Sequence, residues 1–470
     1  MLPIFTIERR KIIIGFAPVR RTAWTHKPFN LPVAIQYKEA IRNALHEFDC
    51  EIIDLEGITQ DGLLFQVDDA DRVASYFIEK QVDGIFVPHC NFGSEESVAR
   101  LCKKVGKPVL LWGPKDKINP EDFYRYRDSQ CGLFATSKVL GMYGVPFTYI
   151  ENCDLDNTKF KEGFESFIRI CSVVKAFKNM RIGQIGTRPA PFASVKCNEM
   201  ELLEKFGIEI LPITMTDLKN KMKLYAEANE QRIARECIAM RAQFKSSCIS
   251  DEQMRQIVIL KRTVEQWAID ENLSAVSTQC WGPMIDVAGI MPCFVLSEVC
   301  DDGLPFICEE DIHGAITAVM AMAAARYEIP VFLADVTIRH PNDPNIELLW
   351  HCGPFAKSLA EDNSNLRIAN HYNRLCPAVG EWTLKKGKMS VLRFDGYTGK
   401  YSLFMGAAEA VDGPATVGSY VWIRVDDWSA WEKKLIYGPY IHHCIGIYQD
   451  VRQILQESCR YIPNVCPDPV

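Results

Sequence analysis

The chain has 470 residues, of which 48% are hydrophobic and 24% charged, and its net charge is −7. The composition is typical of a soluble globular protein, and the length predicts two or three domains. Without a basic stripe, neither nucleic acid nor an anionic membrane surface is an expected partner. The apolar runs end well before the roughly 20 residues that a membrane span needs.

The N-terminus and the cysteines indicate a reducing compartment. The first 11 residues carry charges where a secretion signal would need an apolar stretch. Eighteen cysteines are scattered along the chain, and none forms a CxxC pair. We therefore predict a cytoplasmic protein whose thiols are reduced and mostly buried.

Strands and helices alternate over the first 150 residues. Short apolar runs, such as KIIIGFAP at 11–18, are separated by segments with hydrophobic residues at helical spacing. The predicted strands are 11–18, 50–55, 83–90 and 108–114, and the predicted helices are 33–48, 68–81 and 94–105. This alternation predicts a parallel sheet covered by helices on both faces.

A second cycle of the same kind begins near Arg181, where RIGQIGTR is typical of a strand that runs into a loop. It continues with predicted strands at 208–214, 274–280 and 330–336, and with predicted helices at 194–206, 217–245, 251–272 and 313–327. These elements predict a second α/β layer similar to the first.

The pattern changes after about Gly353, where helical spacing largely disappears. Short runs at 381–384, 388–394, 401–407 and 420–425 are separated by Gly, Asp and Lys turns, and one helix is predicted at 450–460. Such runs are typical of antiparallel strands. The predicted fold is therefore α/β, with two Rossmann- or flavodoxin-like parallel-sheet domains (1–172 and 173–352) and a C-terminal antiparallel β-barrel-like domain (353–470).

Carboxylates and histidines at strand ends are the usual ligands of catalytic metal ions. Glu309 lies where an apolar run gives way to a helix, while Asp335 and His351 each end a strand. His442 and His443 lie in an apolar strand near the C-terminus. Taken singly, the acids are also explained as helix or strand caps and the histidines as core imidazoles. Taken together they predict a metal site, because buried acids at strand ends are desolvated unless paired or metal-bound.

The segments around these residues carry a family resemblance. CEEDIHGAIT (308–317), PVFLADVT (330–337), LLWHCGP (348–354) and GPYIHHC (438–444) resemble the metal-site segments of the L-fucose and L-arabinose isomerases. The resemblance implies Glu309 and Asp335 as ligands of Mn²⁺, with Co²⁺ or Mg²⁺ as substitutes, and as the acid/base pair. It also implies His351 as a further ligand, and either His442 or His443 as the last.

The same resemblance implies an activity, a substrate class and an assembly. An aldose and its ketose would interconvert through a cis-enediol, with the divalent cation polarising the carbonyl group. An aspartate at position 335 resembles the fucose branch of the family, whereas a histidine at position 351 resembles the arabinose branch. The substrate therefore stays open between a fucose- or arabinose-like deoxyhexose or pentose and an anionic hexose such as a sulfonated, sulfoquinovose-like sugar. A homotrimer or homohexamer with active sites between subunits is implied.

Cationic residues follow the first predicted strand, at the edge where α/β sheets bind ligands. Arg20, Arg21, His26 and Lys27 lie in this loop, where the family places an arginine near the substrate; a solvated surface loop is the alternative. Four cations are also suited to an anionic sugar. The predicted substrate-binding residues are Arg20, Arg21, His89, Asn91, Arg188 and Trp281.

Two other functions are consistent with parts of the sequence. A non-catalytic, two-lobed sugar-binding protein would explain the two α/β regions but neither the buried acids nor the histidine-bearing β region. An NAD-dependent oxidoreductase would need a phosphate-binding loop, and RIGQIGTRPAPF lacks the full GxGxxG pattern. The metal-dependent isomerase is therefore the leading hypothesis, with a small-molecule sugar as the expected partner.

Overall fold

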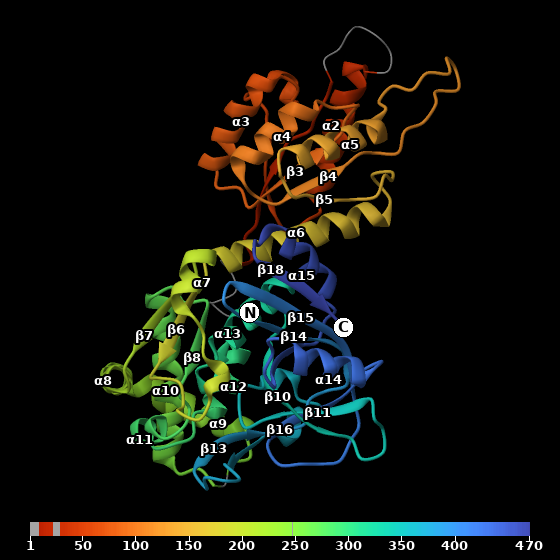
Figure 1. Ribbon diagram of the computed structural model, residues 1–470. Helices are drawn as coiled ribbons and strands as arrows, with labels where there is room; N and C mark the ends of the chain where they lie inside the picture. Colours follow the sequence, from red (N-terminus) through yellow and green to blue (C-terminus); the bar gives the residue numbers. More distant parts are fainter. Residues whose placement is uncertain (1–8, 22–28, 247) are drawn as a thin grey trace. The chain divides into compact units, whose positions relative to one another are not determined.

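The structure is a computed structural model that describes residues 9–21, 29–246 and 248–470 (Figure 1). It forms two compact units, Arg10–Lys175 on the one hand and Ala176–Val470 together with Arg9 on the other. The three-domain division at 172/173 and 352/353 stays a prediction.

The Arg10–Lys175 unit contains a five-stranded parallel sheet with the order β2-β1-β3-β4-β5. Its strands are β1 (Ile13–Phe16), β2 (Glu51–Ile53), β3 (Gly84–Pro88), β4 (Val109–Trp112) and β5 (Thr148–Tyr149). Its helices are α2 (Leu31–Leu45), α3 (Val67–Glu79), α4 (Glu95–Val105), α5 (Ser129–Met142) and α6 (Thr158–Lys178), the last of which runs three residues beyond this unit.

Helices cover both faces of this sheet, as the sequence predicts. Ile85 and Val87 of β3 pack on one side with residues of α3, α4 and α5. Phe86, which points to the other side because side chains alternate along a strand, packs with residues of α2 and α6. The strands are thus buried on both faces, which explains why they form continuous apolar runs.

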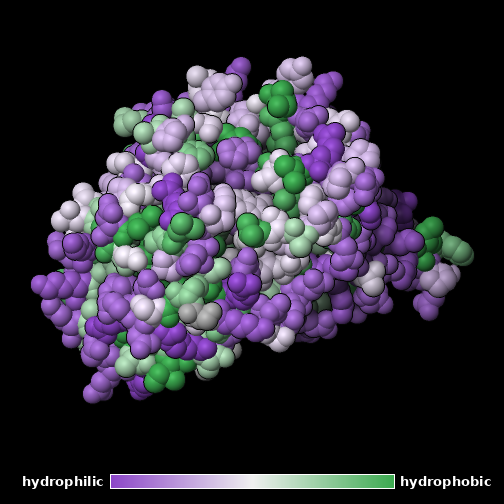
Figure 2. All heavy atoms as spheres, turned by 90° about the horizontal axis from the view of Figure 1, so that it is seen from below, coloured by the Kyte–Doolittle hydropathy of each residue, from purple (hydrophilic) through white to green (hydrophobic). Residues whose placement is uncertain are grey.

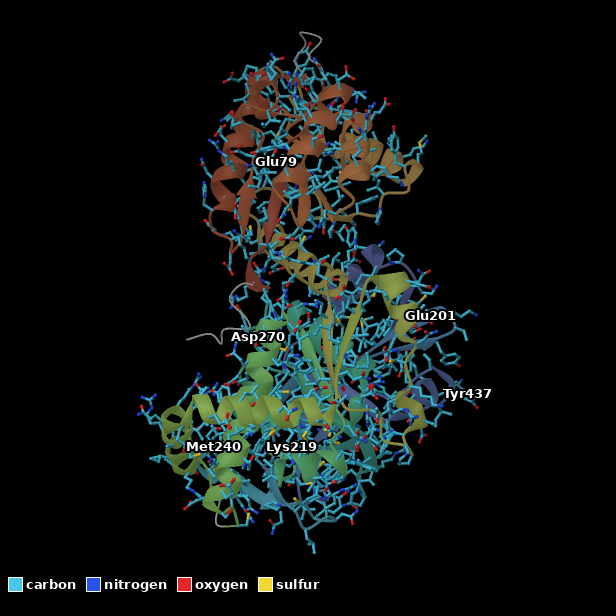
Figure 3. The ribbon with its side chains drawn as sticks, turned by 90° about the vertical axis from the view of Figure 1, so that its left-hand side faces the viewer. Glu79, Glu201, Lys219, Met240, Asp270 and Tyr437 are labelled. Atoms are coloured by element: carbon cyan, nitrogen blue, oxygen red, sulfur yellow. The ribbon has the colours of Figure 1, made fainter. Side chains whose placement is uncertain are left out.

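The second unit contains a four-stranded sheet with the order β7-β6-β8-β9, in which all pairings are parallel. Its strands are β6 (Arg181–Ile185), β7 (Glu209–Ile213), β8 (Ala275–Thr278) and β9 (Phe306–Ile307). Its helices are α7 (Glu199–Phe206), α8 (Met215–Ala228), α9 (Glu230–Gln243), α10 (Asp251–Asp270), α11 (Pro283–Ala288), α12 (Cys293–Asp301) and α13 (Ile312–Ala324). Lys219 on α8, Met240 on α9 and Asp270 at the end of α10 mark three of these helices in Figure 3.

Seven further strands build a mixed sheet with the order β14-β17-β10-β11-β16-β15-β18. They are β10 (Phe332–Arg339), β11 (Ile346–His351), β14 (Gly387–Tyr397), β15 (Lys400–Val411), β16 (Ser419–Arg424), β17 (His443–Ile447) and β18 (Val465–Pro469). Strand β14 also pairs with β15 in a hairpin. Outside this sheet lie β12 (Arg367–Asn370), β13 (Pro377–Glu381), α14 (Trp428–Tyr437) and α15 (Arg452–Ser458).

Two expectations about the C-terminal part need correction. The sequence predicts only antiparallel strands here, but the sheet is mixed because β18 runs parallel to β15. The strand at 330–336 was assigned to a parallel sheet, but β10 pairs antiparallel with both β11 and β17. The first three residues of β10 are all buried. A strand buried on both faces forms an apolar run in either kind of sheet, so its sequence does not reveal the direction of its partners.

Other differences lie in the helices. The helix predicted at 217–245 is two helices, α8 and α9, because the backbone of Asn229 leaves the helical region (φ −130°). Helices α5, α6, α11, α12 and α14 and strand β18 were not predicted. No helix in the described ranges is both long enough and apolar enough to cross a membrane.

The cysteines and the surface fit the composition. All 18 cysteines lie in the described part of the chain, are free of disulfides, and are mostly buried, as predicted. The face drawn in Figure 2 is largely hydrophilic, and its hydrophobic side chains form small separate groups.

Candidate functional site

Four segments of the second unit bring the predicted acids and histidines together. Strand β9 leads into the turn that carries Glu309, β10 carries Asp335, β11 ends at His351, and β17 begins at His443. Asp335 lies directly opposite His443 in the β10–β17 pairing. Because opposite residues of an antiparallel pair are neighbours on the same face of the sheet, this register alone sets a carboxylate beside an imidazole.

The backbone that positions Glu309 in the group has an unusual conformation. Both Glu309 (φ 61°) and Glu310 (φ 59°) have left-handed conformations, which cost of order 1–3 kcal/mol each for residues other than glycine. The turn ends at Asp311, the N-cap of the buried, alanine-rich helix α13. The two neighbouring glutamates diverge, since the carboxylate of Glu310 accepts a hydrogen bond from Gln184 of β6.

The ring of His443 lies at the centre of the group. Its Nε2 is 3.2 Å from Oε2 of Glu309 and 3.5 Å from Oδ1 of Asp335. Nε2 of His351 lies 3.9 Å from the same Asp335 oxygen, and Nε2 of His442 lies 3.8 Å from it. His443 and His351 are buried, whereas the side chain of His442 is 45% exposed.

Three polar atoms in this group are buried without a hydrogen-bond partner: Oδ1 of Asp335, Nε2 of His351 and Nε2 of His443. An unpaired buried polar atom costs roughly 1–3 kcal/mol, so three that converge need an explanation. Ligand atoms of Glu309, His351 and His443 all lie within 4.8 Å of one another. Imidazole and carboxylate groups in this arrangement form a donor set that suits a divalent cation.

Negative charge in the site raises the pKa values of the two buried histidines, His351 and His443. Burial lowers the pKa of His443, but its hydrogen bond to Asp311 and the proximity of Glu309 outweigh this effect and raise the pKa to about 9. Burial likewise lowers the pKa of His351, while Asp335 raises it to about 10. A divalent cation held by these imidazoles and carboxylates would supply positive charge in place of such protons.

Asp311 fixes the orientation of His443. Its Oδ2 lies 2.9 Å from Nδ1 of His443 and also contacts the guanidinium of Arg393, while Oδ1 accepts the backbone N–H of Gly314 at 2.9 Å. Arg393 also contacts Asp395, whose Oδ1 lies 2.9 Å from Nδ1 of His313. With its Nδ1 engaged by a carboxylate, His443 presents Nε2 to the group.

Neither Asp311 nor Arg393 was predicted as a site residue. An aspartate directly before a helix is adequately explained as an N-cap, and Asp311 does cap α13. The available signal was the pair Arg393 and Asp395, two charges at alternate positions of an apolar strand, which must share one face and be compensated there.

Aromatic side chains adjoin the group. Phe192 packs edge-on against Trp281 at 4.9 Å between ring centroids, and its ring centroid lies 6.4 Å from those of His442 and His443. Nη1 of Arg188 donates to the backbone carbonyls of Pro189, Ala190 and Phe192 at 2.9–3.1 Å. Arg188 therefore holds the loop that carries Phe192, and its contact with substrate stays a prediction, as does that of Trp281.

The other predicted substrate residues gather in the N-terminal unit, beside the ends of β1 and β3. Arg20 is buried with its guanidinium 3.6 Å from the ring centroid of Phe65. Arg21 pairs with Glu95 at 3.0 Å, and its backbone N–H donates to Oδ1 of Asn91.

His89 belongs to the same cluster, and its Nδ1 lies 2.9 Å from the carbonyl of Phe92. Burial lowers the pKa of His89 to about 4, so its ring is neutral. Nε2 of His89 and Nδ2 of Asn91 are buried without hydrogen-bond partners. The predicted cations His26 and Lys27 lie outside the described residues.

Comparison with known proteins agrees with the family resemblance. Residues 22–178 match the profile of the fucose/sulfoquinovose isomerase N-terminal domain. The sulfoquinovose isomerase of Priestia megaterium is 25% identical over 441 residues, which cover 93% of this chain and 95% of that protein. The sulfoquinovose isomerase of Alkalicoccus urumqiensis is 26% identical over 405 residues, 86% of each chain. These likenesses support the fucose isomerase-like family, which the metal-site segments also predict.

Proposed function

We propose that this protein is a divalent-metal-dependent aldose–ketose isomerase that acts on a sulfonated, sulfoquinovose-like sugar. The observation that carries the proposal is the convergence of Glu309 with three unpaired buried atoms, on Asp335, His351 and His443. The names of the relatives support the reaction and the substrate class. A non-catalytic sugar-binding protein, the alternative hypothesis, leaves this group without a role.

Glu309, Asp335 and His443 are the proposed ligands of Mn²⁺, with His351 beside them. Between the adjacent histidines we favour His443, because it is buried, Asp311 holds its Nδ1, and its Nε2 faces both acids. His442 is half-exposed and borders the group from outside. When bound, the cation supplies Lewis acidity, which polarises the sugar carbonyl; Co²⁺ and Mg²⁺ are possible substitutes.

Glu309 and Asp335 are also the proposed acid/base pair. Aldose–ketose isomerisation removes the proton at C2 and delivers a proton to C1, so it needs a carboxylate that accepts and a carboxylic acid that donates. The two residues come from different segments, the turn after β9 and strand β10, and both carboxylates lie near Nε2 of His443. The partial exposure of Asp335 leaves it accessible to a sugar.

Arg374 is our candidate for recognition of the sulfonate. Its guanidinium lies 4.8 Å from the ring centroid of Trp281, which contacts Phe192 beside His443. Arg374 is exposed, and within the described ranges no carboxylate pairs with it. The backbone N–H groups of Asn373 and Arg374 both donate to Nδ1 of the buried His371, which anchors the loop. An anchored, unpaired arginine can donate two parallel hydrogen bonds to an anionic group.

The first prediction concerns metal dependence. Removal of divalent cations with EDTA should abolish isomerisation, because the carbonyl then lacks its Lewis acid, and Mn²⁺ should restore it. The measurement is turnover of sulfoquinovose and of a panel of neutral aldoses, with and without added Mn²⁺. Full activity after exhaustive metal removal would contradict the proposal.

The second prediction concerns the two acids. Glu309→Gln and Asp335→Asn should each lower kcat by at least about 100-fold, the usual scale for a lost general base. Mn²⁺ should raise the melting temperature of the wild type far more than that of either variant, since only an ion bound to the folded state stabilises it.

Glu310→Gln is the matched control, because Glu310 shares the same turn but contacts Gln184 instead of the group. It should keep the stabilisation by Mn²⁺. If Glu309→Gln and Asp335→Asn gained as much from Mn²⁺ as the wild type, the ion would bind elsewhere.

The third prediction concerns Asp311. Asp311→Asn keeps the shape of the side chain but removes the charge that orients His443, so Mn²⁺ affinity should fall by about 10- to 100-fold. Asp395→Asn is its control, since Asp395 also pairs with Arg393 but does not contact His443. Both variants should lower the free energy of unfolding, by up to about 3–5 kcal/mol, because each leaves buried Arg393 less compensated. Equal Mn²⁺ affinities in the two variants would refute a specific role for Asp311.

The fourth prediction concerns the anionic group. Arg374→Gln should raise KM for sulfoquinovose at least about tenfold, the scale of a lost charge-assisted hydrogen bond. It should leave kcat/KM for a neutral aldose unchanged. Arg367→Gln, which removes an arginine paired with Glu381, should change neither value. An equal effect of Arg374→Gln on both sugars would rule out sulfonate recognition at this residue.

The fifth prediction concerns assembly. We propose a homotrimer or homohexamer in which Arg20, Arg21, His89 and Asn91 of one subunit border the sugar site of another. The unpaired buried atoms of His89 and Asn91 support a ligand-binding role. Sedimentation should reveal the oligomer, and dilution into monomers should remove activity. A monomer that is fully active at nanomolar concentration would exclude this arrangement.

A further inference from the structure

Four buried cysteines adjoin the group formed by Glu309, Asp335, His351 and His443. Cys280 follows β8, Cys293 begins α12, Cys308 precedes Glu309, and Cys352 follows His351. They come from four separate segments of the second unit, and each is no more than 8% exposed.

The four thiols form a continuous cluster. The Sγ atoms of Cys293 and Cys352 are 3.5 Å apart, and Sγ of Cys352 lies 3.7 Å from Nδ1 of His351. The thiols of Cys280 and Cys352 lie close enough to that of Cys308 to raise its pKa. Sγ of Cys280, Sγ of Cys308 and a carboxylate oxygen of Glu309 all lie within 4.8 Å of one another.

Packing alone accounts for single buried cysteines but not for this arrangement. A buried cysteine usually behaves as a small hydrophobic residue, as Cys102 does in the core of the N-terminal unit. In the cluster, two thiols instead converge on a buried carboxylate. Thiolate sulfur prefers soft or borderline cations such as Zn²⁺, whereas imidazole and carboxylate groups also accept Mn²⁺.

We propose that Cys280, Cys308 and Glu309 form a second cation site, specific for a thiophilic divalent ion such as Zn²⁺ or Cd²⁺. Cys352, whose thiol also affects the pKa of Cys308, is the candidate for a further sulfur ligand. Binding converts the two thiols to thiolates and releases two protons to solvent. Because Glu309 belongs to both groups, a thiophilic ion withdraws it from the Mn²⁺ site, so the two ions exclude one another.

Cadmium alone is the probe for this site, in the full-length, metal-free protein under reducing conditions. Cd²⁺ titration should produce one equivalent of thiolate-to-cadmium charge-transfer absorbance per chain. Cys280→Ala with Cys308→Ala should abolish this absorbance, and Cys102→Ala should leave it unchanged. Since two alanines in one core can impair folding, Cys280→Ala alone is the second variant, with Cd²⁺ affinity expected to fall at least about tenfold. An unchanged absorbance and affinity in these variants would overturn the proposal.

Competition tests the shared carboxylate separately from the isomerase proposal. Mn²⁺ at saturating concentration should weaken Cd²⁺ binding at least about tenfold, and Cd²⁺ should release bound Mn²⁺ into solution, where its electron paramagnetic resonance signal is measured. The doubly substituted cysteine variant should still be stabilised by Mn²⁺. Cd²⁺ and Mn²⁺ binding independently would overturn the shared role of Glu309. Absent isomerase activity with intact cadmium absorbance would refute the proposed function alone.

Discussion

The group at the strand ends depends on one buried carboxylate, Asp311. It caps helix α13, contacts the guanidinium of Arg393 and engages Nδ1 of His443, all without exposure to solvent. Burial by itself would raise the pKa of Asp311, but Arg393 and His443 hold it well below its usual value. A charge desolvated to this degree is tolerated only when its partners are fixed, so one residue couples the start of a helix to the orientation of an imidazole.

The strain at Glu309 follows from the same constraint. Helix α13 must begin at Asp311, and β9 ends only a few residues earlier, so the chain turns through two left-handed glutamates in between. Non-glycine residues keep such conformations only where the surroundings impose them, and they occur disproportionately at functional sites. The turn separates Glu309, which faces the histidines, from Glu310, which faces Gln184.

Much of the fold and of the candidate site could be predicted from the sequence, because the patterns that indicate them lie within short segments. The alternation of apolar runs and amphipathic segments predicted the parallel sheets, and chemistry-bearing residues at strand ends predicted the acids and histidines. The pairing of β10 with β17, which sets Asp335 opposite His443, joins segments far apart in the chain and left no local signal. The choice between His442 and His443 depends on this pairing.

The partners of Asp311 were hidden for the same reason. Asp311 satisfies the rules for a helix cap, and nothing nearby in the sequence points to Arg393 or His443. The thiol cluster also assembles from four distant segments, and its cysteines are ordinary core residues until their contacts are known. Hard and soft ligands thus meet at Glu309: the partly exposed Asp335 lies on the side of the hard set, and the thiols of the soft set are buried.

The most direct test of this account is an anomalous difference map from crystals of the protein grown with Mn²⁺. We expect one strong peak per chain, within coordination distance of Glu309, Asp335 and Nε2 of His443, with Nδ1 of His443 still bonded to Asp311. A peak coordinated by other residues, with Glu309 and His443 left without an ion, would contradict the account.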